Sequence, residues 1–185
     1  MNKFFFSIVT IASLCAITLE VHAQKLEAGS NQIDLGLGAG GRYRVWGAYS
    51  GVSPSVYMHF ERGLGVDVGP GVLGIGAFAG FKVVGSDYYG YGLNWTYIMF
   101  GARAAYHWND WHNVEQLDVY AGVLAGVNVV LDNNTYNDAF VDPRTDVFRH
   151  DTFVGAKWYF SESFGAFAEF GYGVKNAGAG LTFKF

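Results

Sequence analysis

The chain has 185 residues and a net charge of −4 with both signs mixed, so it lacks the basic surface that nucleic-acid binding needs. Its 26 glycines and 18% aromatic residues favour a β-protein with tight turns and a narrow interior. The only cysteine is Cys15. No disulfide or thiolate metal site is therefore expected in the later chain.

Residues 1–23 have the pattern of a cleaved secretory signal peptide. A short basic start at Lys3 precedes an apolar run at residues 4–19, and Val21 and Ala23 precede Gln24 as at a cleavage site. A retained membrane anchor would need a longer apolar run, of about 20 residues. We therefore expect an exported chain whose mature part, residues 24–185, is one domain.

The mature part alternates apolar and mixed residues with a period of two, which predicts β-strands with two different faces. We find no internal repeat and no change of composition that would mark a second domain. Eight strands are predicted, at residues 31–40, 54–61, 71–84, 95–108, 117–131, 148–160, 164–174 and 177–185. We expect an all-β fold, an eight-stranded antiparallel up-and-down transmembrane β-barrel.

The predicted connections alternate in length, as long loops at one end and short turns at the other end of an outer-membrane barrel would. The long loops are expected at residues 41–53, 85–94 and 132–147. The shorter connections include residues 109–116 and 161–163, whereas the turn at 175–176 breaks the rule because it is very short.

The orientation of the two faces follows from the glycines and charges, which share one face of the strands. A narrow eight-stranded barrel needs small residues beside large ones in its interior. The apolar face is then left for lipid. The tryptophans fall at or near predicted strand ends, as aromatic girdles would: Trp46, Trp95, Trp108, Trp111 and Trp158. A soluble lipocalin-like barrel is the alternative, and it would place the charged face in water.

The expected interior charges balance, with four acids and four Lys or Arg residues plus one histidine. The predicted lumenal charge network is Asp34, Glu61, Lys82, Arg103, His107, Asp118, Lys157, Glu169 and Lys184. Buried ions need partners, so we expect a neutral plug of side chains and no water-filled pore. Counting from the turns places Glu169 opposite Thr182 and diagonal to Lys184, and places His107 opposite Asp118.

Several segments together resemble one known family. They are the signal peptide, Tyr106-His107, residues 117–122 (LDVYAG), 155–160 (GAKWYF), 167–173 (FAEFGYG) and 181–185 (LTFKF). With these segments the chain is similar to small eight-stranded outer-membrane barrels of the OmpA/OmpX-like kind, the "outer membrane protein beta-barrel domain" family. The resemblance implies that Leu181, Phe183 and Phe185 form the C-terminal signal read by the outer-membrane insertion machinery. It implies no specific activity.

Three groups of residues invite a chemical interpretation. His107, Asp118 and Arg103 could form a general-base cluster, but a hydrogen-bonded plug explains them as well. Ser55, His59 and Glu61 share a strand face and would suit a lipid-modifying enzyme, although that face points inward. Metal ligation is conceivable at His107, Asp110 and His112, and at Asp132, Asp138, Asp142 and Asp146, yet neither set has the spacing of a known site.

We therefore expect a monomeric outer-membrane barrel of a Gram-negative type envelope, without catalytic residues, cofactor or metal. Its role would be structural, or a surface interaction made by the loops at residues 41–53, 85–94 and 132–147. A lipid-modifying barrel enzyme and a narrow passive channel or small-ligand binder are the alternatives. The expected partners are outer-membrane lipid and, during assembly, the insertion machinery.

Overall fold

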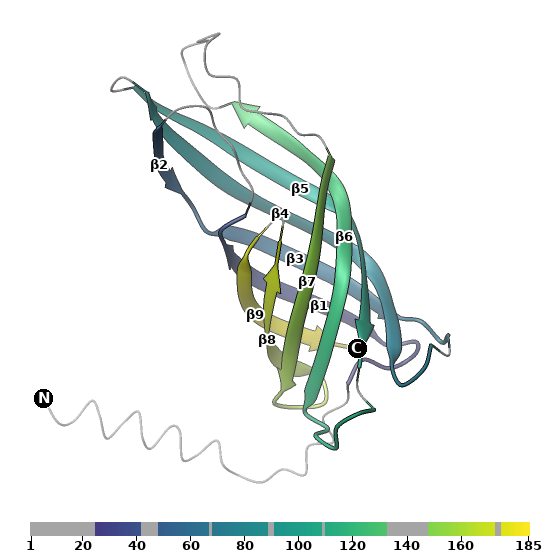
Figure 1. Ribbon diagram of the computed structural model, residues 1–185. Coiled ribbons are helices and arrows are strands. Elements are labelled where there is room, and N and C mark those ends of the chain that lie inside the picture. Colours follow the sequence, from purple (N-terminus) through teal and green to yellow (C-terminus); the bar gives the residue numbers. More distant parts are fainter. Residues whose placement is uncertain are drawn as a thin grey trace, which may run out of the picture.

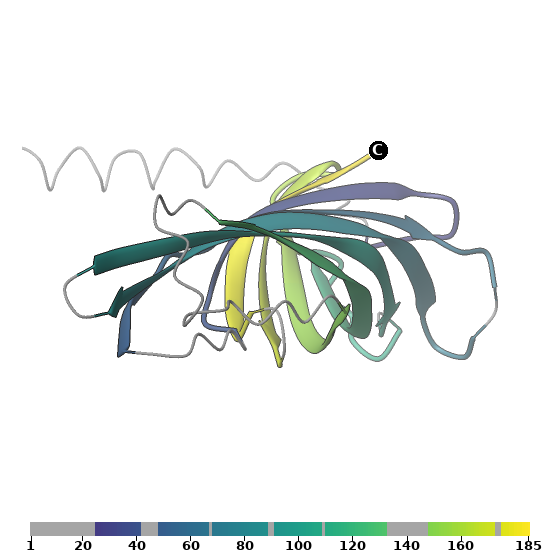
Figure 2. The same ribbon diagram turned by 90° about the horizontal axis from the view of Figure 1, so that it is seen from above.

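The computed structural model describes residues 25–41, 48–66, 68–88, 91–108, 110–132, 148–172 and 175–185. The expected signal peptide and most of the loop at 132–147 lie outside these ranges. No helix among the described residues is long and apolar enough to cross a membrane. The described elements are all strands, and they curve around a common interior (Figure 1, Figure 2).

The strands are β1 (Asn31–Ala39), β2 (Ala48–Val52), β3 (Ser55–Gly63), β4 (Val72–Tyr88), β5 (Tyr91–His107), β6 (Leu117–Asp132), β7 (Phe148–Tyr159), β8 (Phe164–Gly171) and β9 (Ala177–Lys184). Each pairs antiparallel with its neighbour in the order β1-β3-β4-β5-β6-β7-β8-β9, and β9 pairs back with β1. The ring is therefore a closed eight-stranded up-and-down barrel, as the sequence predicted. Closure leaves no open edge in the ring.

The ninth strand, β2, does not add a place to the ring. It pairs with the upper part of β4, and only Ser53 and Pro54 separate it from β3. Because proline has no N–H to give to the ladder, a break at Pro54 is expected there. We therefore regard β2 and β3 as two pieces of one side of the barrel wall.

One of the expected loops is mostly strand, and a second one contains a short strand. The predicted loop at 85–94 is wrong, because β4 and β5 remain paired from Val72↔His107 up to Tyr88↔Tyr91. The predicted loop at 41–53 contains β2, and its residues 42–47 lie outside the described part. The alternation had weakened at residues 85–94, where tyrosine and glycine replace aliphatic residues, although both types can continue a paired ribbon.

The barrel wall is uneven in height. β4 and β5 have 17 residues each, whereas β8 and β9 have eight each. A barrel strand needs about 9–11 residues to cross a bilayer. The hairpin β4–β5, with β2 beside it, therefore extends well past the end of the short hairpin β8–β9 (Figure 1).

Side-chain direction follows the predicted parity on every strand whose side chains are described. Exposed large apolar residues form an outer belt around the barrel: Leu35, Leu37, Val56, Met58, Phe60, Ile75, Phe81, Phe100, Val123, Val129, Val154, Trp158, Phe170, Leu181, Phe183 and Phe185. The interior face holds the glycines, the large rings and the charges. This inversion, apolar outside and polar inside, is typical of a membrane barrel.

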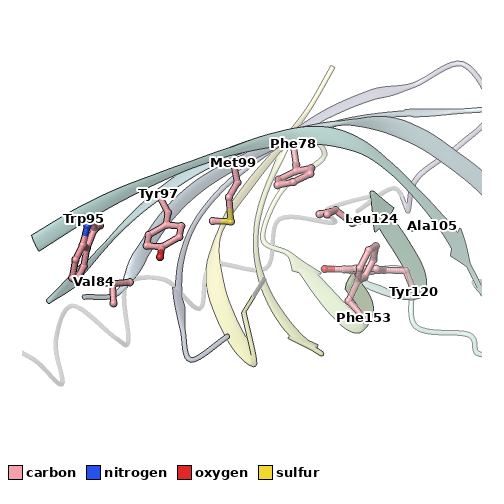
Figure 3. Packing of buried hydrophobic residues seen from close by; sticks show 9 residues of the cluster. All are labelled: Phe78, Val84, Trp95, Tyr97, Met99, Ala105, Tyr120, Leu124 and Phe153. Carbon is pink, nitrogen blue, oxygen red and sulfur yellow. The ribbon is translucent and has the colours of Figure 1, made fainter. Parts of the chain in front are cut away.

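The upper interior contains an apolar and aromatic cluster. Trp95, Tyr97, Met99 and Phe78 project from β4 and β5 toward the same side of the wall, and Leu124 of the neighbouring β6 lies on that side as well (Figure 3). Trp95 is 1% exposed, so its predicted place in a lipid-facing girdle is wrong. Its odd number puts it on the inward face of β5. The direction of a side chain follows the alternation along the strand even where the residue is near a strand end.

The other described tryptophans do face outward. Trp108, Trp111 and Trp158 are all exposed and lie near the end of the barrel that carries the short connections. Trp108 packs edge-on against Tyr106, with ring centroids 4.9 Å apart. These residues occupy the places where an aromatic girdle forms in membrane barrels.

Candidate functional site

The lower and middle interior of the barrel holds a cluster of ionisable side chains. We call it the lumenal cluster, and it consists of Asp34, Glu61, Arg103, His107, Asp118, Lys157, Glu169 and Lys175. They come from β1, β3, β5, β6, β7 and β8 and from the segment before β9. All eight are buried. Strand pairing brings them together from distant parts of the chain.

His107 lies between two carboxylates. Its Nδ1 is 2.8 Å from Asp118 Oδ1, and its Nε2 is 2.8 Å from Glu61 Oε1. Carboxylates accept hydrogen bonds, so both contacts are satisfied when both ring nitrogens carry protons. The ring also stacks on Tyr120, with centroids 5.2 Å apart. His107 therefore serves as a cationic bridge between β3 and β6.

Arg103 connects Glu61, which His107 also contacts, to Glu169. Its Nη2 lies 2.8 Å from Glu169 Oε2, and its Nε lies 3.4 Å from Glu61 Oε2. The guanidinium also lies over the Phe153 ring, 3.8 Å from the centroid. An arginine can use its planar fork and its ring-stacking face together, which suits a buried junction.

Lys157 and Lys175 complete the charge balance. Lys157 Nζ donates to Asp34 Oδ2 over 2.9 Å, and Lys175 donates to Glu169 Oε1. Four carboxylates thus face Arg103, two lysines and a doubly protonated His107. The lumenal cluster is neutral in that state, which limits the cost of burying its charges.

Neutral polar groups extend the cluster. Tyr159 Oη donates to Gln32 Oε1 over 2.7 Å, Gln32 Nε2 lies 3.3 Å from Asp34 Oδ1, and Tyr120 Oη donates to Glu169 Oε2 over 3.2 Å. Two of these bonds go to the carboxylates of Asp34 and Glu169, and the third links Tyr159 to Gln32. A hydrogen-bonded network of this kind can hold one arrangement of the interior.

The structure brings seven of the nine predicted network residues together and separates two. Lys82 is buried higher on β4 and donates to the carbonyl of Gly40. Lys184 lies near the opposite end, where its Nζ is 3.4 Å from the carbonyl of Lys25. The sequence suggested Lys82 and Lys184 as two of the cations that balance the four carboxylates. In the structure, Lys175 and the His107 imidazolium have this role.

Both predicted registers are wrong, and the observed registers explain this exchange. Glu169 pairs with Gly178, not with Thr182, because the turn after β8 holds more residues than expected. Glu169 therefore lies near the turn and Lys175, far from Lys184. His107 pairs with Tyr120, so Asp118 is not directly opposite, yet the two side chains meet on the diagonal.

Sequence reasoning missed Lys175 and Gln32. Lys175 lies in the connection between β8 and β9, where the strand parity does not apply, so the sequence held no signal for it. Gln32 shares the inward parity of Asp34 on β1. For Gln32 the missed signal was parity carried to the start of the strand.

The candidate chemical groups have structural roles here. Ser55 Oγ donates to the Gly38 carbonyl over 3.2 Å, and His59 stacks on Tyr57 with centroids 4.8 Å apart. No group of His, Cys, Asp or Glu in the described ranges has a geometry that could hold a metal ion. Asp132 ends β6, and Asp138, Asp142 and Asp146 lie outside the described residues.

One of three comparisons with known proteins, that with solved structures, supports the fold. No protein-family model and no curated protein sequence matches the chain significantly. The outer membrane protein OprG from Pseudomonas aeruginosa is similar in structure, with a TM-score of 0.57, 11% identity, and coverage of 89% of this chain and 99% of OprG. The eight-stranded up-and-down barrel expected from the sequence is thus the fold of this chain.

Two further structures align with lower TM-scores. The N-terminal barrel domain of P. aeruginosa OprF aligns with a TM-score of 0.47 and 16% identity, covering 85% of this chain and 98% of that domain. A designed transmembrane β-barrel aligns with a TM-score of 0.47 and 12% identity, covering 88% of this chain and all of the design.

Proposed function

We propose that this protein is an outer-membrane barrel with a closed interior, and that it acts as a structural component of the envelope and as a scaffold for surface contacts. The packing of the lumenal cluster carries this proposal. Glu61, His107, Asp118 and Lys157 are 0% exposed, although they face the barrel axis. Side chains that line a water-filled pore would be exposed to that water.

The outer belt supports a location in a membrane. Phe170, Leu181, Phe183 and Phe185 lie on β8, on β9 and at the C-terminus, and each is more than two-fifths exposed. In water, an exposed apolar surface that encircles the molecule would drive aggregation. In a bilayer the same surface contacts lipid acyl chains instead of water. The aromatic residues Trp108 and Trp158 suit the boundary between the hydrocarbon and the water.

The absence of enzymatic activity is part of the proposal, and the geometry of the candidate groups supports it. Both ring nitrogens of His107 already face carboxylates, so neither is left to act as a base. Ser55 and His59 point into the packed interior and are buried. A lipid-modifying enzyme needs a nucleophile that its lipid substrate can reach.

A role in surface contacts is suggested by the tall side of the wall. β4 and β5 continue for several residues above the level where β8 and β9 end, and β2 adds a third strand to this projection. Function carried by projecting segments on a rigid scaffold is common. With the loops at 41–53 and 132–147, the hairpin tip at 85–94 would form the outward surface.

Fractionation and gel mobility test the proposal together. The protein should collect in the outer-membrane fraction and migrate differently in boiled and unboiled detergent samples, because a folded barrel resists unfolding by detergent. A surface-binding comparison between the wild type and a deletion of residues 133–147 then tests the contact role. One mobility in both samples would overturn the barrel, and equal binding would remove that loop as the contact site.

A further inference from the structure

The outer belt is interrupted at one place on β7. His150 and Thr152 point outward there and are exposed, between Phe148 above and Val154 below. Phe148 stacks on His150, with ring centroids 6.2 Å apart and planes inclined by 30°. Two successive outward positions thus carry hydrogen-bonding side chains on a face that is otherwise apolar.

The interruption lies at mid-height of the neighbouring strand. Thr152 pairs with Val123, and His150 pairs with Ala125. On β6 the outward row remains apolar above these two residues, through Val127, Val129 and Leu131. Paired residues on adjacent strands differ in height by only about 3 Å in a tilted barrel. The polar positions of β7 therefore lie beside the apolar middle of β6.

The outer belt also ends at a low level on β8 and β9, on the other side of β7. Tyr172, next to Thr152, donates its backbone N–H to the Thr152 carbonyl over 3.0 Å, and β8 has already ended at Gly171. Asn176, on the far side of the turn, is also exposed. The belt on the β7–β9 side thus ends at the level of Thr152, Tyr172 and Asn176.

The height of the belt can be compared with that of a bilayer. On β6 the outward apolar row runs from Leu117 to Leu131, and on β7 the continuous part runs only from Val154 to Phe160. With a rise of about 3.3 Å per residue and a tilt of about 40°, the rows span roughly 35 Å and 15 Å. The apolar band of a membrane barrel is about 25 Å tall.

We propose that lipid headgroups and their water descend to His150 and Thr152 on the β7–β9 side, so that the barrel thins the bilayer there. This inference rests on the proposed membrane location. Leaving a hydroxyl and an imidazole in hydrocarbon without partners is unfavourable, and a short apolar surface is matched by local thinning of the bilayer. Because β6 is tall, the thinning is confined to one side of the barrel.

Site-directed spin labels test the inference, because the only cysteine of the chain is Cys15, in the expected signal peptide. Residues 24–185 would be refolded into phosphatidylcholine vesicles with either Thr152→Cys or its registered partner Val123→Cys labelled. Collision with oxygen reports hydrocarbon, and collision with a water-soluble nickel chelate reports water. We expect the label at 152 to collide with nickel at least several times more often than the label at 123.

Each other outcome contradicts a definite statement. If both labels collide with oxygen and not with nickel, the belt is level and the thinning is wrong, although the membrane barrel stands. If both collide with nickel, the membrane location itself is wrong. If the label at 152 is immobile and reached by neither reagent, a second copy of the protein covers this face, and headgroup contact is wrong.

A second variant tests the same inference without a spin label at His150 or Thr152. The double substitution His150→Leu with Thr152→Val makes the outer row of β7 continuous up to Phe148 and leaves the inward residues unchanged. It should move the folding-efficiency optimum toward lipids with longer acyl chains. The control Ala125→Val, on the apolar row of β6, should leave this optimum in place, and an unmoved optimum in the double variant would overturn the inference.

Discussion

Arg103 and Glu169 meet in the barrel interior, with Nη2 and Oε2 2.8 Å apart, although they come from β5 and β8 and neither side chain is exposed. Along the wall these strands are separated by β6 and β7. The contact therefore joins two parts of the ring directly through the lumen. The Asp34–Lys157 pair does the same between β1 and β7, over 2.9 Å.

Removing Arg103 should destabilise the barrel strongly. Arg103→Met leaves Glu169 and Glu61 without their shared cation, and breaking a buried pair from one side costs about 3–5 kcal/mol. Urea unfolding in detergent or lipid, followed by gel mobility, would give the change in unfolding free energy. The double variant Arg103→Met with Glu169→Gln should recover part of the loss, and an unchanged midpoint in the single variant would contradict the buried cluster.

Lys157 and Lys184 should differ although both face inward. Lys157→Met removes the partner of Asp34 and should cost several kcal/mol, as for other buried pairs. Lys184 is 7% exposed near the end of the barrel, where its Nζ lies 3.4 Å from the Lys25 carbonyl and 5.8 Å from the Tyr159 ring centroid. Because Lys184 lies at the barrel end and not in the lumenal cluster, Lys184→Met should cost less than Lys157→Met, about 1 kcal/mol. The same unfolding assay compares the two variants. Equal losses of unfolding free energy would contradict the placement of Lys157 inside the lumenal cluster and Lys184 outside it.

Gly178 makes room for the Tyr57 side chain. A Cβ at position 178 would overlap the Tyr57 hydroxyl, and one at Gly36 would lie 2.7 Å from Tyr57 Cζ. Gly178→Ala should therefore destabilise the barrel by about 1–3 kcal/mol through overpacking. The effect should shrink in a Tyr57→Phe background, which removes the overlapping oxygen. Additive losses in a double-mutant cycle would contradict this contact.

The tryptophans should divide into two groups in lipid. Trp158 is 48% exposed on the outer belt, whereas Trp95 is 1% exposed in the interior. In vesicles of lipids with brominated acyl chains, Trp158→Phe should remove a strongly quenched component of the emission. Trp95→Phe should remove a component that the bromine atoms barely quench. The reverse assignment would mean that the two faces of the sheet are exchanged.

Parity along the strands was enough to predict the closed barrel and the direction of the side chains, because each strand has one environment on each face. The register between paired strands was harder to predict from the sequence. The number of residues in a turn sets which side chains pair, and the extra residues before β9 moved Glu169 from Lys184 to Lys175. The length of β4 and β5 was also missed, since tyrosine and glycine near 85–94 fit both a loop and a ribbon.

The sequence could indicate that the interior is charged, but not how the charges are arranged. His107 was identified as a lumenal residue, yet its second carboxylate, Glu61, is 46 positions away on β3, which is not adjacent to β5, the strand of His107. Only the curvature of the closed ring brings these groups within hydrogen-bonding distance. Contacts across a lumen leave no pattern in a single sequence.

Ionic conductance tests the central statement, a closed lumen, most directly. The refolded protein would be added to planar lipid bilayers in concentrated potassium chloride, and its insertion would be verified by gel mobility in matched vesicles. Because the lumenal cluster fills the interior, we expect no stable single-channel conductance from the wild type. Stable, reproducible channels from the folded wild-type protein would contradict the closed interior and, with it, the proposed function.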